Sequence, residues 1–132
     1  MEISTDVSLW ALIRHAGRWL GNLRRAGETR LAESRAALRG VIVASRRTRA
    51  YLRSVEETGR KDHAREAELS ALWSELGFAL QDLGLSKLAK RCDITGRYWS
   101  DPGTFDQAFL EKADVGLERM ERLALELLAC SN

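Results

Sequence analysis

Five arginines on one predicted helix form the most specific chemical pattern in the chain, and we call them the arginine stripe: Arg35, Arg39, Arg46, Arg49 and Arg53. At 100° per residue they fall within about 80° of one another, nearly opposite the apolar side of their helix. Arg39, Arg46 and Arg49 have no carboxylate three or four residues away to pair with. Planar guanidinium groups recognise carboxylates and phosphates, so the stripe is a candidate binding surface.

Four interpretations of the stripe compete. It could be a solvated helix face touched by acidic side chains from the C-terminal half, or it could dock an acidic protein surface. A row of arginines also suits the phosphates of nucleic acid, but Tyr51 is the only aromatic residue near it on this helix, which gives base stacking little support. An anionic membrane surface is disfavoured, because the helix lacks large residues for insertion.

Charge is divided unequally along the chain. Residues 1–61 hold thirteen Lys and Arg against six Asp and Glu, whereas residues 62–132 hold eight against thirteen, although the net charge is only +2. Clustered like charge repels, so a neighbour normally compensates it. If the protein forms a homo-oligomer, the acidic flank of its last helix, with Asp114, Glu118 and Glu121, could meet the stripe of another copy.

Aromatic residues mark a second candidate surface. Trp10 projects more than 100° from the centre of its helix's apolar face, so it is either capped by another part of the chain or exposed as an interface anchor. A second group precedes the only proline, Pro102, and consists of Arg97, Tyr98 and Trp99. These residue types are typical of a binding hot spot, but they also occur where a helix corner is held in place by packing. Both alternatives stay open for each site.

Catalytic and metal-binding patterns are weak. The chain has two histidines, His15 and His63, and neither lies beside a predicted nucleophile. His63 and Glu66 have the i, i+3 spacing of two metal ligands, but no second Glu-His set exists to complete a bundle site. No glycine-rich loop precedes a Lys-Ser or Lys-Thr pair. We therefore expect no enzyme activity, no metal and no cofactor.

Apolar residues recur at three- and four-residue spacing in five segments, which is typical of amphipathic helices. The predicted helices are residues 5–25, about 28–58, 63–83, about 86–99, and a last helix after residue 104 that could break at 114–116. Short connections make neighbouring helices antiparallel. The sequence thus predicts an all-α fold, an up-and-down antiparallel bundle of four principal helices plus one short helix, in a single domain over residues 1–132.

Local signals predict several helix ends and part of the core. Gly59 is expected in the left-handed conformation and Asp62 as an N-cap, with Ser86 as a second cap and Thr104 with Gln107 as a capping box. The predicted core includes a strict four-three seam and further apolar positions on the other helices: Leu69, Trp73, Leu76, Leu80 and Leu83, then Leu38, Val41, Thr48, Leu52, Leu88, Cys92, Trp99, Phe109, Met120 and Leu127.

Compartment and function follow from these patterns only as expectations. Charged residues interrupt the N-terminal 20 residues and no long apolar run exists, so we expect a cytoplasmic protein with reduced, partly buried Cys92 and Cys130. The hypothesis is a helical protein-interaction module, such as an adaptor, regulator or immunity-type protein, that binds an acidic partner through the arginine stripe. The alternative is a nucleic-acid-binding accessory protein that contacts phosphates through the same stripe.

Overall fold

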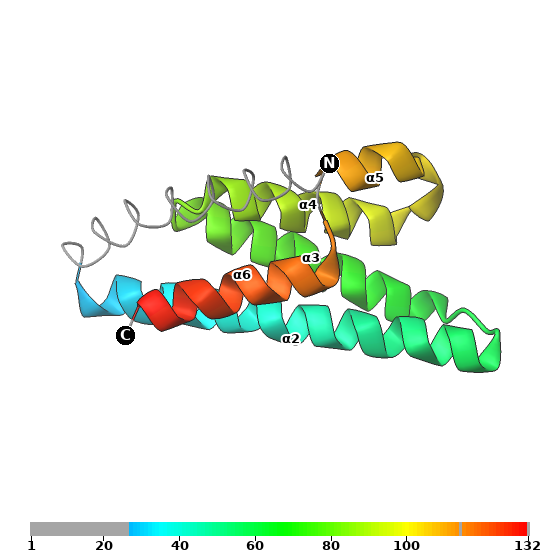
Figure 1. Ribbon diagram of the computed structural model, residues 1–132, viewed down its shortest axis with the longest axis horizontal. Coiled ribbons are helices and arrows are strands. Elements are labelled where there is room, and N and C mark those ends of the chain that lie inside the picture. Colours follow the sequence, from blue (N-terminus) through cyan, green and yellow to red (C-terminus); the bar gives the residue numbers. More distant parts are fainter. Residues whose placement is uncertain (1–26, 114, 132) are drawn as a thin grey trace.

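The computed structural model describes residues 27–113 and 115–131, and these form helices and their connections (Figure 1). The described part of the chain contains no β-strand, so the predicted all-α class is confirmed. The helix predicted over residues 5–25, with Trp10 and His15, lies outside the described residues. None of the described helices combines the length and the apolar character that crossing a lipid bilayer requires.

Two long helices follow the predicted boundaries closely. Helix α2 (Glu28–Thr58) ends at Gly59, whose φ of 69° confirms the left-handed conformation predicted for it. Helix α3 (His63–Asp82) begins after Asp62, whose side chain accepts a hydrogen bond from the backbone N–H of Arg65. Glycine adopts positive φ without the steric cost of a Cβ atom, and aspartate satisfies an otherwise unpaired N–H, so both ends are determined locally.

The remaining helices differ from prediction at their starts. Helix α4 (Ser86–Ser100) has Leu85 at the N-cap position without a side-chain cap, so the prediction of Ser86 as a cap is wrong. Thr104 belongs to the 3₁₀ turn η1 (Pro102–Thr104), and the capping box predicted for it is wrong as well. Asp106 instead accepts a hydrogen bond from the N–H of Phe109 (2.7 Å), because it directly precedes α5 (Gln107–Ala113).

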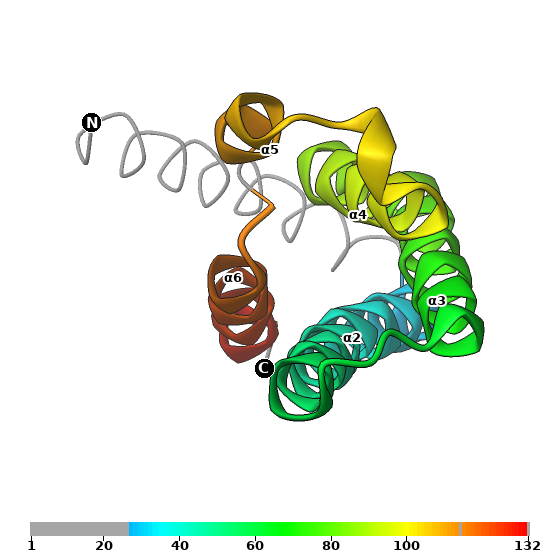
Figure 2. The same cartoon turned by 90° about the vertical axis from the view of Figure 1, so that its right-hand side faces the viewer.

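The last helix is broken near residues 114–116, as the sequence suggested, and α6 (Leu117–Cys130) follows the break. Figure 1 shows α2, α3 and α4 joined by short connections at alternate ends, with α6 running along α2 in the opposite direction. In the end view α6, α2, α3 and α4 follow one another around the bundle, and α5 lies beyond α4 (Figure 2). Helix α2 therefore packs against both α3 and α6.

The core lies between α2, α3, α4 and α6. Every residue of the predicted α3 seam is buried, and Leu38, Val41, Leu88, Cys92, Met120 and Leu127 are buried as predicted. Trp73 is fully buried and its indole N–H donates to the hydroxyl of Thr48 on α2 (2.9 Å). A buried indole needs such an acceptor, so this pair fixes α3 against α2.

Helices α3 and α4 approach closely at Gly96. A Cβ atom built there would lie 3.0 Å from the backbone nitrogen of Ser74 and 3.1 Å from the carbonyl oxygen of Ser70. The Ser70 hydroxyl also donates to the Gly96 carbonyl oxygen (2.8 Å). Only glycine leaves room for α3 at this position of α4.

Two predicted core residues are exposed. Phe109 on α5 is 44% exposed, and its ring stacks on that of Phe105 at 5.0 Å. Leu52 on α2 is 45% exposed although it lies on the core side of its helix, because it borders an open pocket described below. Cys92 and Cys130 are both free thiols, but Cys130 is exposed rather than partly buried.

Candidate functional site

The arginine stripe separates into an outward part and an inward part. Arg39, Arg46 and Arg53 are exposed on α2, and we call these three the outer arginine row. They recur every seven residues, so they lie about 10.5 Å apart along the helix and within roughly 40° of one another. Arg35 and Arg49 are half-buried and do not belong to the row.

Glu121 on α6 pairs with two arginines of the stripe, Arg49 from its inward part and Arg46 from the outer row. Its carboxylate bonds to the terminal nitrogen of Arg49, and the Nε atom of Arg46 lies 3.5 Å from the same oxygen. The Glu121 side chain is only 16% exposed, against 40% for Arg49 and 63% for Arg46. The ion pair therefore joins α6 to α2, and most of the Arg46 side chain stays in solvent.

The outer row keeps cationic groups that the described residues, 27–113 and 115–131, leave exposed. Arg53 lies 3.3 Å from Glu57, but both side chains are more than half exposed, so a pairing of this kind is weak in water. Arg39 has no ion-pair partner within residues 27–113 and 115–131. A competing carboxylate could thus reach each of the three arginines.

Small apolar side chains accompany the outer arginine row. Val43 follows Arg39 by four residues and is 51% exposed, and Ala50 follows Arg46 by four residues and is also exposed. Positions four residues apart are neighbours on a helix surface, so these apolar side chains flank the guanidinium groups. The face presents charge and a shallow apolar surface together.

The predicted aromatic corner turns inward. Trp99 is buried, with its ring edge-to-face against Tyr51 (5.7 Å) and against Tyr98 (5.2 Å). Arg97 is exposed and pairs with Asp93 on its own helix (3.0 Å). Trp10, the fourth member of this predicted site, lies outside the described residues. The corner is therefore packed at Trp99 and exposed at Arg97.

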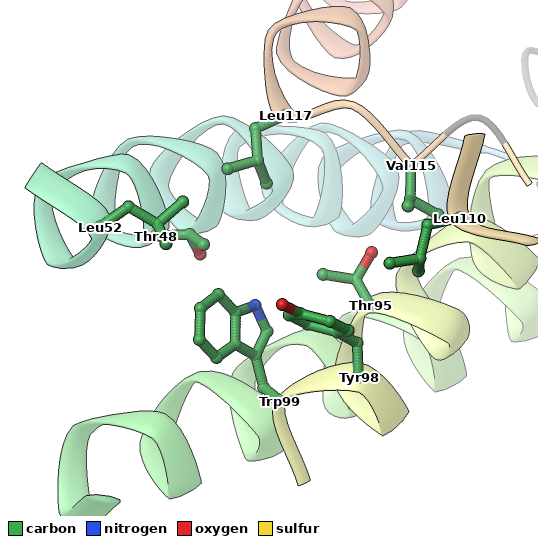
Figure 3. A pocket seen from close by; sticks show the side chains of 8 residues that line it. All are labelled: Thr48, Leu52, Thr95, Tyr98, Trp99, Leu110, Val115 and Leu117. Atoms are coloured by element: carbon green, nitrogen blue, oxygen red, sulfur yellow. The ribbon is translucent and has the colours of Figure 1, made fainter. Parts of the chain in front are cut away.

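Tyr98 and Trp99 line a pocket that the sequence did not indicate. Among the described residues its walls come from α2, α4, α5 and the start of α6, and they enclose about 150 Å³: Thr48, Leu52, Thr95, Tyr98, Trp99, Leu110, Val115 and Leu117. Figure 3 shows these side chains converging from the four elements on one apolar space. No periodic pattern marks this set, because each wall is contributed by a different helix or loop.

The pair of His63 and Glu66 forms a hydrogen-bonded group at the start of α3. The Nδ1 atom of His63 lies 3.2 Å from Glu66, whose other oxygen accepts a hydrogen bond from the Tyr51 hydroxyl (2.8 Å). Burial of the phenol and the neighbouring Glu66 carboxylate raise the pKa of Tyr51. No group of three metal-ligating side chains occurs in the part of the chain that the structure describes.

Sequence reasoning identified the arginines but not their partner in the fold. Glu121 was one of three acidic residues on a predicted flank, and nothing in its spacing distinguishes it from Glu118, which is exposed. The contact depends on the register of α6 against α2, which is a tertiary property. Comparisons with protein-family models, with curated proteins and with solved structures found no match to this chain.

Proposed function

We propose that the chain is a helical interaction module that binds an acidic protein partner through the outer arginine row of α2. The observation that carries this proposal is the alignment of Arg39, Arg46 and Arg53 as exposed guanidinium groups at seven-residue spacing. Arginine is enriched in protein interfaces because its planar fork pairs with a carboxylate while its stem packs on apolar surface.

The spacing favours a helical partner. An α-helix that crosses α2 at a small angle brings equivalent positions together about every seven residues. Carboxylates repeated with that period would meet Arg39, Arg46 and Arg53 in turn. The exposed Val43 and Ala50 would contact apolar or small side chains of the partner between the charged positions.

The apolar neighbours also favour protein over nucleic acid. A phosphate track gains from an unbroken positive surface, whereas Val43 lies between Arg39 and Arg46, and Glu121 shares Arg46. A protein interface uses both features. The exposed Val43 loses water when it is covered by a partner, and the Glu121 carboxylate holds the Arg46 guanidinium in a defined position.

Synthetic probes test the proposal directly. We would titrate the protein into a labelled helical peptide with Glu at every seventh position and Ala or Leu between, and into a peptide of the same composition in scrambled order. We expect the periodic peptide to bind at least about 5-fold more tightly. Equal affinity for both peptides would reduce the interaction to net charge and would contradict the proposal.

A duplex oligonucleotide serves as the third probe. Binding of the oligonucleotide but not of the periodic peptide, with an affinity that falls steeply between about 50 and 200 mM salt, would replace the proposal by phosphate recognition. Sedimentation of the protein alone, measured in parallel, reports self-association. A homo-oligomer that dissociates into monomers at high salt would make a second copy of the chain the acidic partner.

A further inference from the structure

The pocket between α2, α4 and α6 offers a binding site of defined size and polarity. We propose that it binds a small ring-shaped apolar molecule that carries one hydrogen-bonding group, such as a phenol. The volume of about 150 Å³ corresponds to a cavity that accepts a benzene-sized molecule. This inference does not rest on the proposed function, because the pocket lies on the core side of α2 and the outer arginine row lies on its opposite side.

Apolar groups make most of the pocket wall. Leu110, Val115 and Leu117 come from the chain around the break between α5 and α6, and Leu52 comes from α2. The two threonine hydroxyls are already satisfied. Thr48 donates to the Ala44 carbonyl and accepts from the Trp73 indole, whereas Thr95 donates to the Arg91 carbonyl.

Two polar atoms remain for a ligand. Figure 3 shows the Tyr98 hydroxyl and the Trp99 indole nitrogen on the side of their rings that faces the pocket. Neither group has a hydrogen-bond partner within the described residues. The edge-to-face contacts of Trp99 with Tyr51 and Tyr98 hold both rings in place, so the two groups are oriented before a ligand enters.

Access is available at one side of the pocket. Leu52 is 45% exposed, and Tyr98, Leu110, Val115 and Leu117 are each half-buried. A buried core cavity would have fully covered walls, so these exposures indicate a mouth through which a molecule of ring size can pass. The chemistry that fits is an apolar ring with an oxygen that can accept from Trp99 or exchange a hydrogen bond with Tyr98.

Phenol and toluene are the probes for this site, because they have similar size and only phenol forms hydrogen bonds. We would titrate each into the whole chain and follow the methyl NMR signals of Leu52, Val115 and Leu117. Both probes should shift these signals, because each fills the apolar space, and hydrogen bonds to the pocket would compensate phenol for the apolar methyl group that it lacks. The Tyr98→Phe variant should lose about 3-fold in phenol affinity and keep its toluene affinity.

A pocket-filling variant completes the test. Val115→Phe should weaken both probes by at least about 10-fold, whereas Leu125→Phe, at an exposed position of α6 outside the pocket, should bind them like the original chain. The proposal is overturned if neither probe shifts the pocket signals at millimolar concentration, or if a folded Val115→Phe variant binds unchanged. If that variant does not fold, Tyr98→Phe decides, since unchanged phenol affinity would overturn the proposal as stated.

Discussion

The Glu121 carboxylate of α6 binds the Arg49 guanidinium of α2, although 72 positions separate the two residues in the chain. The same carboxylate lies 3.5 Å from Arg46, so one acidic residue joins an inward and an outer-row arginine of α2 to α6. The acidic flank that the sequence suggested for contact with another copy thus supplies a contact within this chain.

Replacement of Glu121 should destabilise the fold modestly. The Glu121→Gln variant keeps the side-chain size but removes the negative charge beside Arg46 and Arg49. Because both arginines are partly exposed, we expect a loss of about 0.5–1 kcal/mol in the free energy of unfolding, measured by urea denaturation. Glu126→Gln, at an exposed position of the same helix, is the control and should change stability by less than about 0.5 kcal/mol. Equal effects of the two variants would contradict a structural role for Glu121.

Loss of the buried hydrogen bond between Trp73 and Thr48 should lower the free energy of unfolding more than loss of the Glu121 charge does. Thr48→Val preserves the shape of the side chain but leaves the fully buried indole N–H without an acceptor. An unsatisfied buried donor costs about 1–3 kcal/mol, and denaturation should show a loss in that range. Thr95→Val is the matched control, because among the described residues the Thr95 hydroxyl bonds only to a carbonyl of its own helix. If Thr48→Val lowers the free energy of unfolding no more than Thr95→Val does, the hydrogen bond to Trp73 contributes nothing to stability.

Because α3 and α4 pack closely at Gly96, we expect replacement of this glycine to destabilise the fold. Alanine normally stabilises a helix interior relative to glycine by about 1 kcal/mol. Gly96→Ala should nevertheless destabilise by about 1–3 kcal/mol, because its Cβ would press on the backbone of α3 at Ser70 and Ser74. Gly103→Ala is the comparison, since the nearest atom to its Cβ is 3.6 Å away on Asp101. A stabilised Gly96→Ala variant would contradict the observed approach of the helices.

The two thiols should react at very different rates. Burial raises the pKa of the Cys92 thiol to about 12, whereas Cys130 is exposed. Iodoacetamide at pH 8 should therefore alkylate Cys130 first, and Cys92 should react only when the chain unfolds, as mass mapping over time would reveal. The raised pKa also means that the stabilisation from the neutral Cys92 thiol is complete below about pH 9 and is lost as the pH rises toward 12. Equal alkylation rates in the folded protein would refute this burial.

The periodicity of apolar residues predicted the described helices and most of the core, because the buried face of a helix follows from the spacing of residues within that helix. Leu69, Trp73, Leu76, Leu80 and Leu83 repeat on one face, and any partner helix buries them. The caps predicted at Ser86 and Thr104 were wrong because the two helices begin at different positions: Leu85 is at the N-cap position of α4, and Asp106 directly precedes α5.

The candidate sites were only partly predictable for a different reason. The outer arginine row follows from helical spacing alone, so Arg39, Arg46 and Arg53 could be placed together before the fold was known. The partnership of Glu121 and the pocket at Leu52 depend on how α6 is placed beside α2 and α4. That placement results from long-range packing, which leaves no periodic signal in the sequence.

The central claim is that the outer arginine row recognises carboxylates on a partner helix. The most direct measurement compares two triple variants in binding to the periodic acidic peptide: Arg39→Gln, Arg46→Gln and Arg53→Gln against Arg60→Gln, Lys87→Gln and Lys90→Gln. The second set removes the same charge from exposed positions elsewhere. We expect the row variant to bind at least about 10-fold more weakly and the control to stay within about 3-fold of the original chain. Equal losses in both variants would contradict the claim.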